Sequence, residues 1–301
     1  MENFNGYSEL DVYSYKSAIK MVSQQKRSVL GDKVMMFPDL VGEKVAMVEW
    51  LAQITAKMET SATGDTEFDE ASFQRRWITS NIYTRNIIVP SSTSVYRIND
   101  PKGSIVTAVV AGFNRAQDEG IIKAFKAPSL LDKIGSTTSS FNSSTNTIAA
   151  SYGVVGSTPQ GINLAKLELA HEKLLAVDGM AVQDSDVYVL INAKQQTALF
   201  RELKLTNRDY VDADVIATGK LGKFLGMNII VIADGFLPKD ENDLTSIFVW
   251  DKSAMGLGIW KSFNVTLDRL PTKKNATGIM TSMVFGATRL NDAKVFEIKC
   301  K

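Results

Sequence analysis

A strand-rich segment with a polar middle, residues 31–90, limits most strongly what this chain can fold into. Its runs of β-branched and aromatic residues are at 33–37, 44–50 and 76–89. The polar stretch 55–72 separates the outgoing runs from the returning run, which favours a long hairpin over a pair of helices. A two-stranded ribbon is only marginally stable in water, so we expect this hairpin to pack against a neighbour.

Charges are segregated along the hairpin. Its tip carries a group of acids, which are Glu59, Asp65, Glu67, Asp69 and Glu70. The returning strand opens with a basic pair, Arg75 and Arg76. Acid and base therefore occupy different parts of one projecting feature.

The first thirty residues predict an N-terminal arm. Acidic residues come first and are followed by four basic residues, which are Lys16, Lys20, Lys26 and Arg27. With Ser14 as the cap, Ile19 and Val22 share one side of a helix while the lysines stay in water.

The rest of the chain mixes helices and strands. Asp100 and Pro101 predict the start of a helix that runs to about residue 127. The segment 135–158, rich in Gly, Ser, Thr and Asn, predicts an ordered or partner-covered loop. Thr158-Pro159 predicts a helix over residues 160–177 with two buried faces. A small α/β layer is predicted next. It consists of a strand over residues 187–191, a helix capped by Asn192 and Gln195 that ends near residue 203, and a strand over residues 228–233. Alternation near residues 263–268 and the apolar runs 279–285 and 295–298 predict a β-rich C-terminal third.

Composition excludes several classes of protein. The 301 residues are 45% hydrophobic and 22% charged, which is typical of globular chains rather than disordered ones. A net charge of +1 argues against a dedicated nucleic-acid binder. One histidine and one cysteine exclude a disulfide framework and a Cys/His zinc cluster. No apolar run is long enough for a membrane helix, and the polar N-terminus predicts no signal peptide, so we expect synthesis in the cytoplasm.

Few residues offer catalytic chemistry. Helical spacing places His171 beside leucines, which indicates a structural role. Cys300 lies between Lys299 and Lys301 at the chain end, where residues are commonly mobile. Residues 218–223 have the wrong order for a phosphate loop, and residues 256–258 predict a plain loop. Two pairs of aspartates have a spacing that would allow them to bind Mg²⁺, namely Asp184 with Asp186 and Asp212 with Asp214. The favoured interpretation is that both pairs are solvated charges at a strand edge. We therefore expect no catalytic, cofactor-binding or metal site, and no enzyme.

Three short segments carry a family resemblance, and they are residues 73–77 (FQRRW), 97–101 (RINDP) and 116–122 (AQDEGII). Together with the order of elements, they resemble the major capsid proteins of tailed bacteriophages over nearly the whole chain. The resemblance implies an α+β fold with an N-terminal arm, an extended β-hairpin loop, a peripheral domain with a long helix, and an axial α/β domain. The implied limits are 1–30 for the arm, 31–90 for the extended loop, 91–160 and 256–301 for the peripheral domain, and 161–255 for the axial domain.

The resemblance also implies a function. A structural virion protein of this family self-assembles into hexamers and pentamers of an icosahedral shell that encloses double-stranded DNA. The implied partners are other copies of the chain, a portal, a separate scaffolding or decoration protein and packaged DNA held by non-specific contacts, with no membrane. The implied location is the virion capsid, assembled in the host cytoplasm. Near-neutral net charge suits self-association.

Two groups of site residues follow. We expect the hairpin to clamp a neighbouring subunit through Glu59, Asp65, Glu67, Asp69, Glu70, Arg75 and Arg76. We expect the arm to face the genome through Lys16, Lys20, Lys26 and Arg27. Alternatively, these four residues only keep one helix face wet while Ile19 and Val22 dock on a neighbouring subunit.

Three other functions stay open at this point. A cellular nanocompartment shell would share the fold but enclose a cargo enzyme. An oligomeric metal-dependent α/β enzyme would depend on Asp184 or Asp212. A tail-tube or other virion protein would form filaments or rings in place of spheres.

Overall fold

The computed structural model describes residues 28–43, 45–51, 73–89, 102–153, 158–177, 186–202 and 222–301, with Ile54, Ala56, Met58 and Glu70. The longer strands are β1 Met35–Phe37, β2 Val45–Leu51, β3 Phe73–Thr79, β4 Asn81–Val89, β8 Val187–Asn192, β10 Met227–Ile232, β11 Thr245–Asp251, β12 Met255–Leu270, β13 Ala276–Arg289 and β14 Val295–Cys300. The two-residue strands are β5 Ser129–Leu130, β6 Thr138–Ser139, β7 Thr147–Ile148 and β9 Lys223–Phe224. The helices are α3 Lys102–Lys126, α4 Ser143–Asn146, α5 Leu164–Val177 and α7 Ala193–Arg201.

These strands form three sheets. Their orders are β1-β12-β13-β4, β7-β14-β11-β8-β10-β9 and β2-β3-β5-β6. The mixture of helix and sheet confirms the predicted α+β class. Among the described residues, no helix is both long and apolar enough to cross a membrane.

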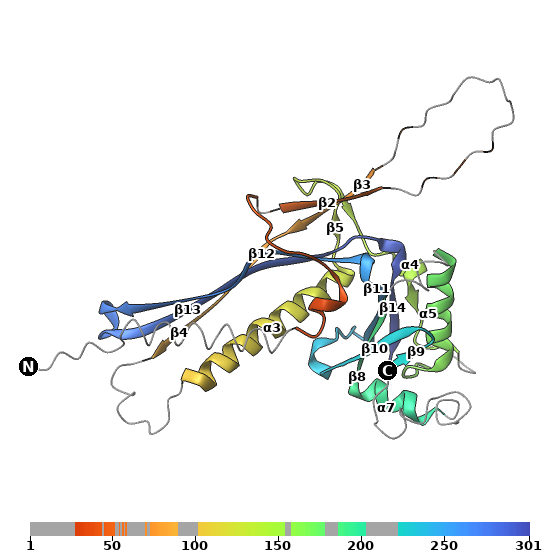
Figure 1. The fold of residues 1–301 in the computed structure, drawn as a ribbon. Helices are drawn as coiled ribbons and strands as arrows, with labels where there is room; N and C mark the ends of the chain where they lie inside the picture. Colours follow the sequence, from red (N-terminus) through yellow and green to blue (C-terminus); the bar gives the residue numbers. More distant parts are fainter. Residues whose placement is uncertain are drawn as a thin grey trace, which may run out of the picture.

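The long helix α3 runs beside the strand pair β12–β13 (Figure 1). Four of its buried side chains share one face because they lie four or eight residues apart, and they are Val109, Phe113, Ile121 and Phe125. Phe113 meets Phe263 of β12 with ring centroids 5.0 Å apart. The predicted helix is confirmed over Lys102–Lys126, whereas its predicted start at Asp100 and Pro101 lies outside the described residues.

The six-stranded sheet has a core on each face, because successive side chains of a strand point to opposite sides. Tyr188 and Leu190 of β8 pack in the same cluster as Phe125 of α3. Val189 and Ile191 pack in the cluster that contains Leu167 of α5. In Figure 1, α5 and α7 accordingly lie across this sheet from α3. The predicted strand, helix and strand are confirmed as β8, α7 and the parallel β10, and α7 ends at Arg201, two residues before the predicted end near residue 203.

The predicted domain limits do not coincide with this sheet. Strand β14 pairs with β11, and β7 pairs with β14, so two strands come from the segments 91–160 and 256–301. The limits themselves stay a prediction. Within the predicted loop 135–158, the described residues 135–153 include β6, α4 and β7, and Asn142 caps α4 by accepting from the amides of Ser144 and Thr145.

One predicted helix boundary and one predicted loop are wrong. Helix α5 begins at Leu164 rather than residue 160, because Asn163 accepts from the Lys166 amide at 2.9 Å and acts as its cap. Its second predicted face is buried only in part, since Leu169 packs against the core that contains Ile162, whereas Ala176 is exposed. Residues 256–258 form part of β12 rather than a loop: a side chain at Gly256 would lie 3.2 Å from Leu290, so glycine allows close packing there.

The predicted hairpin is confirmed, and its returning run divides between two sheets. Strands β2 and β3 pair from Val45↔Thr79 to Leu51↔Phe73. After the buried Ser80, the chain continues as β4 and pairs with β13 instead. The crossing is tight, because a Cβ atom at Gly286 of β13 would lie 2.0 Å from the Thr79 carbonyl oxygen. Only glycine fits at this point, which fixes where the hairpin leaves the body.

Candidate assembly surface

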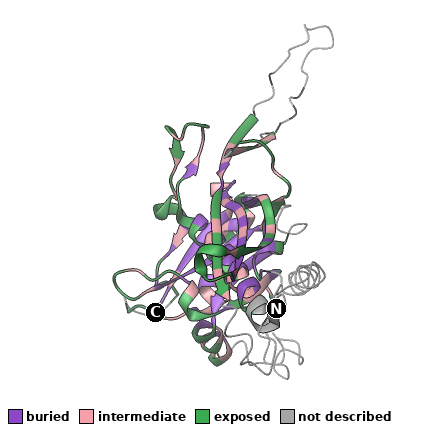
Figure 2. Ribbon diagram, turned by 90° about the vertical axis from the view of Figure 1, so that its left-hand side faces the viewer, coloured by how far each residue is buried: buried purple, intermediate pink, exposed green. Residues whose placement is uncertain are grey.

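One face of the hairpin sheet is apolar and exposed. The register pairs Leu51 with Phe73 and Met47 with Trp77, and Trp77 in turn pairs with Leu130 of β5. These five side chains therefore share one face, which we call the hairpin face. Phe73 is 56% exposed, Leu51 48% and Met47 45%. Figure 2 shows exposed strand segments above the mostly buried interior of the subunit.

An ion pair interrupts the apolar side chains of the hairpin face. The Arg75 Nε lies 2.8 Å from Glu49 Oε1, and the two side chains are 58% and 35% exposed. Exposed pairs of this kind contribute about 0–1 kcal/mol, so the pair adds little to folding. The hairpin face as a whole is suited to contact with another molecule, since contiguous exposed apolar side chains mark interaction sites.

The opposite face of the hairpin contacts the body of the subunit. The Arg76 guanidinium lies 5.7 Å from the centre of the Trp50 ring. Its Nη2 donates to Asp292 Oδ2 at 3.1 Å. Asp292 belongs to the short helix η5 Asp292–Lys294, just after β13.

Asp292 also accepts from Arg289, which is completely buried. The sequence gives little sign of this junction, because an Arg and an Asp three residues apart are common in any chain. Sequence reasoning missed both residues.

The structure describes three of the seven residues predicted to contact another subunit. Glu70 is exposed, whereas Arg75 and Arg76 are paired within their own chain, with Glu49 and Asp292. The other predicted hairpin and arm residues lie outside the described residues, and they are Glu59, Asp65, Glu67, Asp69, Lys16, Lys20, Lys26 and Arg27.

A basic surface that the sequence analysis did not single out lies at the turn between β12 and β13. Lys273 and Lys274 are exposed there. Lys274 and Asn275 adopt left-handed backbone conformations, with φ of 53° and 55°, which reverse the chain tightly. No acidic residue occurs between Asp268 and Asp292. The adjacent lysines between two strand-like runs were the available signal.

The residues considered for catalysis have structural positions. His171 is half-buried on α5. The position of Cys300 near the chain end predicts a mobile residue. Its side chain is instead 0% exposed, in β14 opposite Thr245. Burial raises the pKa of its thiol to about 12, so it stays protonated and unreactive at neutral pH. Asp186 is exposed just before β8, and Asp184, Asp212 and Asp214 lie outside the described residues. Across the described ranges, no group of three or more His, Cys, Asp or Glu residues is placed to hold a metal ion.

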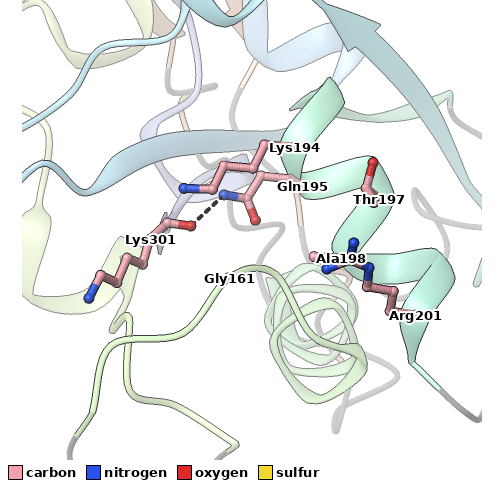
Figure 3. Close-up of a pocket in the computed structure, with 7 residues that line it drawn as sticks. All are labelled: Gly161, Lys194, Gln195, Thr197, Ala198, Arg201 and Lys301. Carbon is pink, nitrogen blue, oxygen red and sulfur yellow. Dashed lines mark hydrogen bonds between the residues drawn. The ribbon is translucent and has the colours of Figure 1, made fainter.

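A cavity of about 370 Å³ beside α7 is lined by basic and neutral residues (Figure 3). Its central residue, Gln195, accepts from the Ile162 amide at 2.7 Å and donates to the Lys301 carbonyl at 3.0 Å. Both ends of this amide side chain are therefore occupied by the protein itself. The lining contains no acidic side chain, imidazole or thiol.

A model of the family described as phage capsid protein matches residues 8–301, which is nearly the whole chain. The chain belongs to this family. It is a structural component of a bacteriophage capsid, and its predicted likeness to tailed-phage major capsid proteins is confirmed. The family and the fold are those of shell proteins rather than enzymes. No curated protein matches the chain.

Solved capsid structures share the fold of this capsid protein. The capsid of cyanophage P-SCSP1u is similar with a TM-score of 0.63 at 15% identity, over 92% of this chain and 89% of that chain. Microbacterium phage Oxtober96 gives the same score and identity over 92% of both chains. The capsid of a native GTA particle has a TM-score of 0.59 at 15% identity over 91% of both chains. The likeness confirms the tailed-phage capsid fold.

Proposed function

We propose that this capsid protein assembles into the hexamers and pentamers of an icosahedral shell that encloses double-stranded DNA. The observation that carries the proposal is the hairpin face, where the side chains of Phe73, Leu51 and Met47 are about half exposed on the β2–β3 strand pair. A hairpin with few core contacts of its own gains most by packing on another copy. Repetition over many identical interfaces multiplies a small energy per contact.

Charge complementarity supports one arrangement of neighbouring copies. The segment 59–70 holds five acids and no base, and the turn between β12 and β13 presents Lys273 and Lys274. We infer that the acidic tip of one subunit meets this basic turn on another. Salt screens such exposed pairs, so assembly weakens as ionic strength rises.

A charge swap tests this clamp. The double variant E67K/D69K should fold but not form shells, as judged by negative-stain microscopy of concentrated protein. Adding K273E/K274E should restore shells, because it recreates opposite charges across the contact. The exposed Lys194 on α7 gives the control, since K194E should not restore them. Normal shells from E67K/D69K alone would contradict the clamp.

The contents and form of the particles test the wider proposal. A chain that stays monomeric at high concentration, with and without a scaffolding protein, contradicts it. Particles that hold a protein cargo and no DNA would indicate a nanocompartment shell instead. Filaments or rings would indicate a tail-tube protein. The portal, a separate scaffolding or decoration protein, and assembly in the host cytoplasm belong to the same proposal.

We further propose that the arm faces the genome through Lys16, Lys20, Lys26 and Arg27. Four phosphate contacts per copy predict a salt dependence with a slope near −0.9 for each neutralised phosphate. Changing all four to glutamine should leave empty shells intact and reduce the length of DNA retained. Failure to form shells would instead make the arm an assembly element whose charge is incidental.

A further inference from the structure

One carboxylate at the base of the hairpin is shared by two arginines from different parts of the subunit. Asp292 Oδ1 accepts from Nε of Arg289 at the end of β13. Asp292 Oδ2 accepts from Nη2 of Arg76 in β3 at 3.1 Å and from the Ser139 hydroxyl at 2.6 Å. The Asp292 main-chain carbonyl is held as well, because the Asn146 side-chain amide donates to it at 2.6 Å. Asp292 therefore joins the hairpin to the body through its side chain.

The Arg289 half of this junction is fixed. Its side chain is 0% exposed, and Nη1 donates to the carbonyls of Phe125 and Ala127 at 2.7 and 3.1 Å. These carbonyls lie at the C-terminal end of α3, where main-chain acceptors lack helical partners and a cation is favoured. Nη2 donates to the Ser139 carbonyl at 3.2 Å. Every nitrogen of this guanidinium thus has an acceptor within the body.

The Arg76 half is held much less fully. Beyond Asp292, the described residues offer its guanidinium one further acceptor, the carbonyl of the neighbouring Arg75, which accepts from Nη1 at 3.2 Å. Its Nε is buried and has no acceptor in the described part of the chain. Two guanidinium groups share one carboxylate, so the junction keeps a net positive charge. Among the described residues, Asp292 is therefore the charged partner that links Arg76 to the body of the subunit.

Backbone pairing alone holds the hairpin weakly against rotation. Strand β3 pairs with β5 at one position, Trp77↔Leu130, and its chain passes into β4 through Ser80. Arg76 precedes this pairing position by one residue, on the side from which the hairpin projects. A side-chain link there opposes swinging of the hairpin about its base.

We propose that Asp292 is a positioning residue for assembly, which sets the direction of the β2–β3 hairpin by holding Arg76 against the fixed Arg289. The inference rests on the proposed function, in which the hairpin must reach a neighbouring copy. A subunit whose hairpin points in the required direction for a tenth of the time has an apparent affinity about tenfold lower. Loss of the contact should therefore impair assembly more than folding.

Distances between spin labels test the direction of the hairpin in the unassembled full-length protein. The labels are placed at Leu51→Cys, at the end of β2, and at Lys194→Cys, on α7. D292N and R76Q should both shift and broaden the distance distribution relative to the otherwise unaltered chain. E49Q is the matched control, because the Glu49–Arg75 pair joins β2 to β3 and does not reach the body. Its distribution should match that of the unaltered chain.

Both variants are informative. R76Q keeps Arg289 paired with Asp292, so it tests the proposal even if D292N does not fold. An unchanged distribution in R76Q overturns the proposal, and so does a change in E49Q equal to that in R76Q. In unlabelled protein, R76Q should raise the critical concentration for shells about tenfold. If the unaltered chain forms no shells with or without a scaffolding protein, the proposed function fails, while the distances still decide the role of Asp292.

Discussion

Replacing Phe73 with alanine tests the hairpin face most directly. Phe73 opens β3 and is 56% exposed. A buried phenylalanine covers about 200 Å², so a neighbouring subunit has about 100 Å² of this side chain to cover. At about 25 cal/mol per Å², losing that area weakens each contact by about 2.5 kcal/mol. This corresponds to a roughly 60-fold weaker association constant.

Light scattering over a concentration series measures the effect on assembly. F73A should raise the critical concentration for shell formation by roughly 60-fold. Its free energy of unfolding in urea should change by less than about 0.5 kcal/mol, because the side chain is exposed in the free subunit. Gln74 is exposed on the opposite face of the same strand, and Q74A should assemble normally. The reasoning is refuted if F73A assembles at the same concentration as the unaltered chain, or if its unfolding free energy falls by an equal amount.

Three further outcomes are expected within the subunit. Burial raises the pKa of Cys300 from 9.0 to about 12. The contribution of the protonated thiol to the free energy of unfolding is therefore complete below pH 9 and falls by at most about 4 kcal/mol as the pH rises toward 12. Urea unfolding of C300A should show a shallower fall over the same pH range. Hydrogen bonds, chiefly from the Ser136 hydroxyl, lower the pKa of Asp132 from 3.8 to about 2. The Asp132 carboxylate also accepts from the Ser136 main-chain amide at 3.0 Å, so the turn over residues 132–136 should loosen as the pH falls through 2. At neutral pH, D132N should likewise lower the protection of the Ser136 amide from hydrogen exchange. Asp118 is 5% exposed and accepts from the Leu30 amide at 3.0 Å, so D118A should cost about 3 kcal/mol in urea unfolding, whereas E119Q at an exposed neighbouring position should cost almost nothing.

The sequence predicted the elements whose signals are local. Apolar and polar residues alternate along β12, and Asn192 followed by Gln195 marks the start of α7. Both patterns involve residues close together in the chain, where backbone geometry alone relates them. The same holds for the β2–β3 hairpin, whose runs and polar middle are visible without the fold. The start of α5 was misplaced because Pro159 competes with Asn163 as a local signal, and the observed cap is Asn163.

The sequence by itself determined that β2 and β3 pair as a hairpin, that the segment 59–70 is acidic, and that the chain lacks the residues for a disulfide framework or a zinc cluster. Only the tertiary structure decided which hairpin face is exposed and what holds the other face. Arg76 and Asp292 are 216 positions apart, and Arg289 is 164 positions from the carbonyl of Phe125 that it binds. Cys300 is buried because β14 pairs with β11, although a residue so near the chain end is commonly mobile. No periodicity relates residues at such separations, because they meet only when the sheets and α3 have packed.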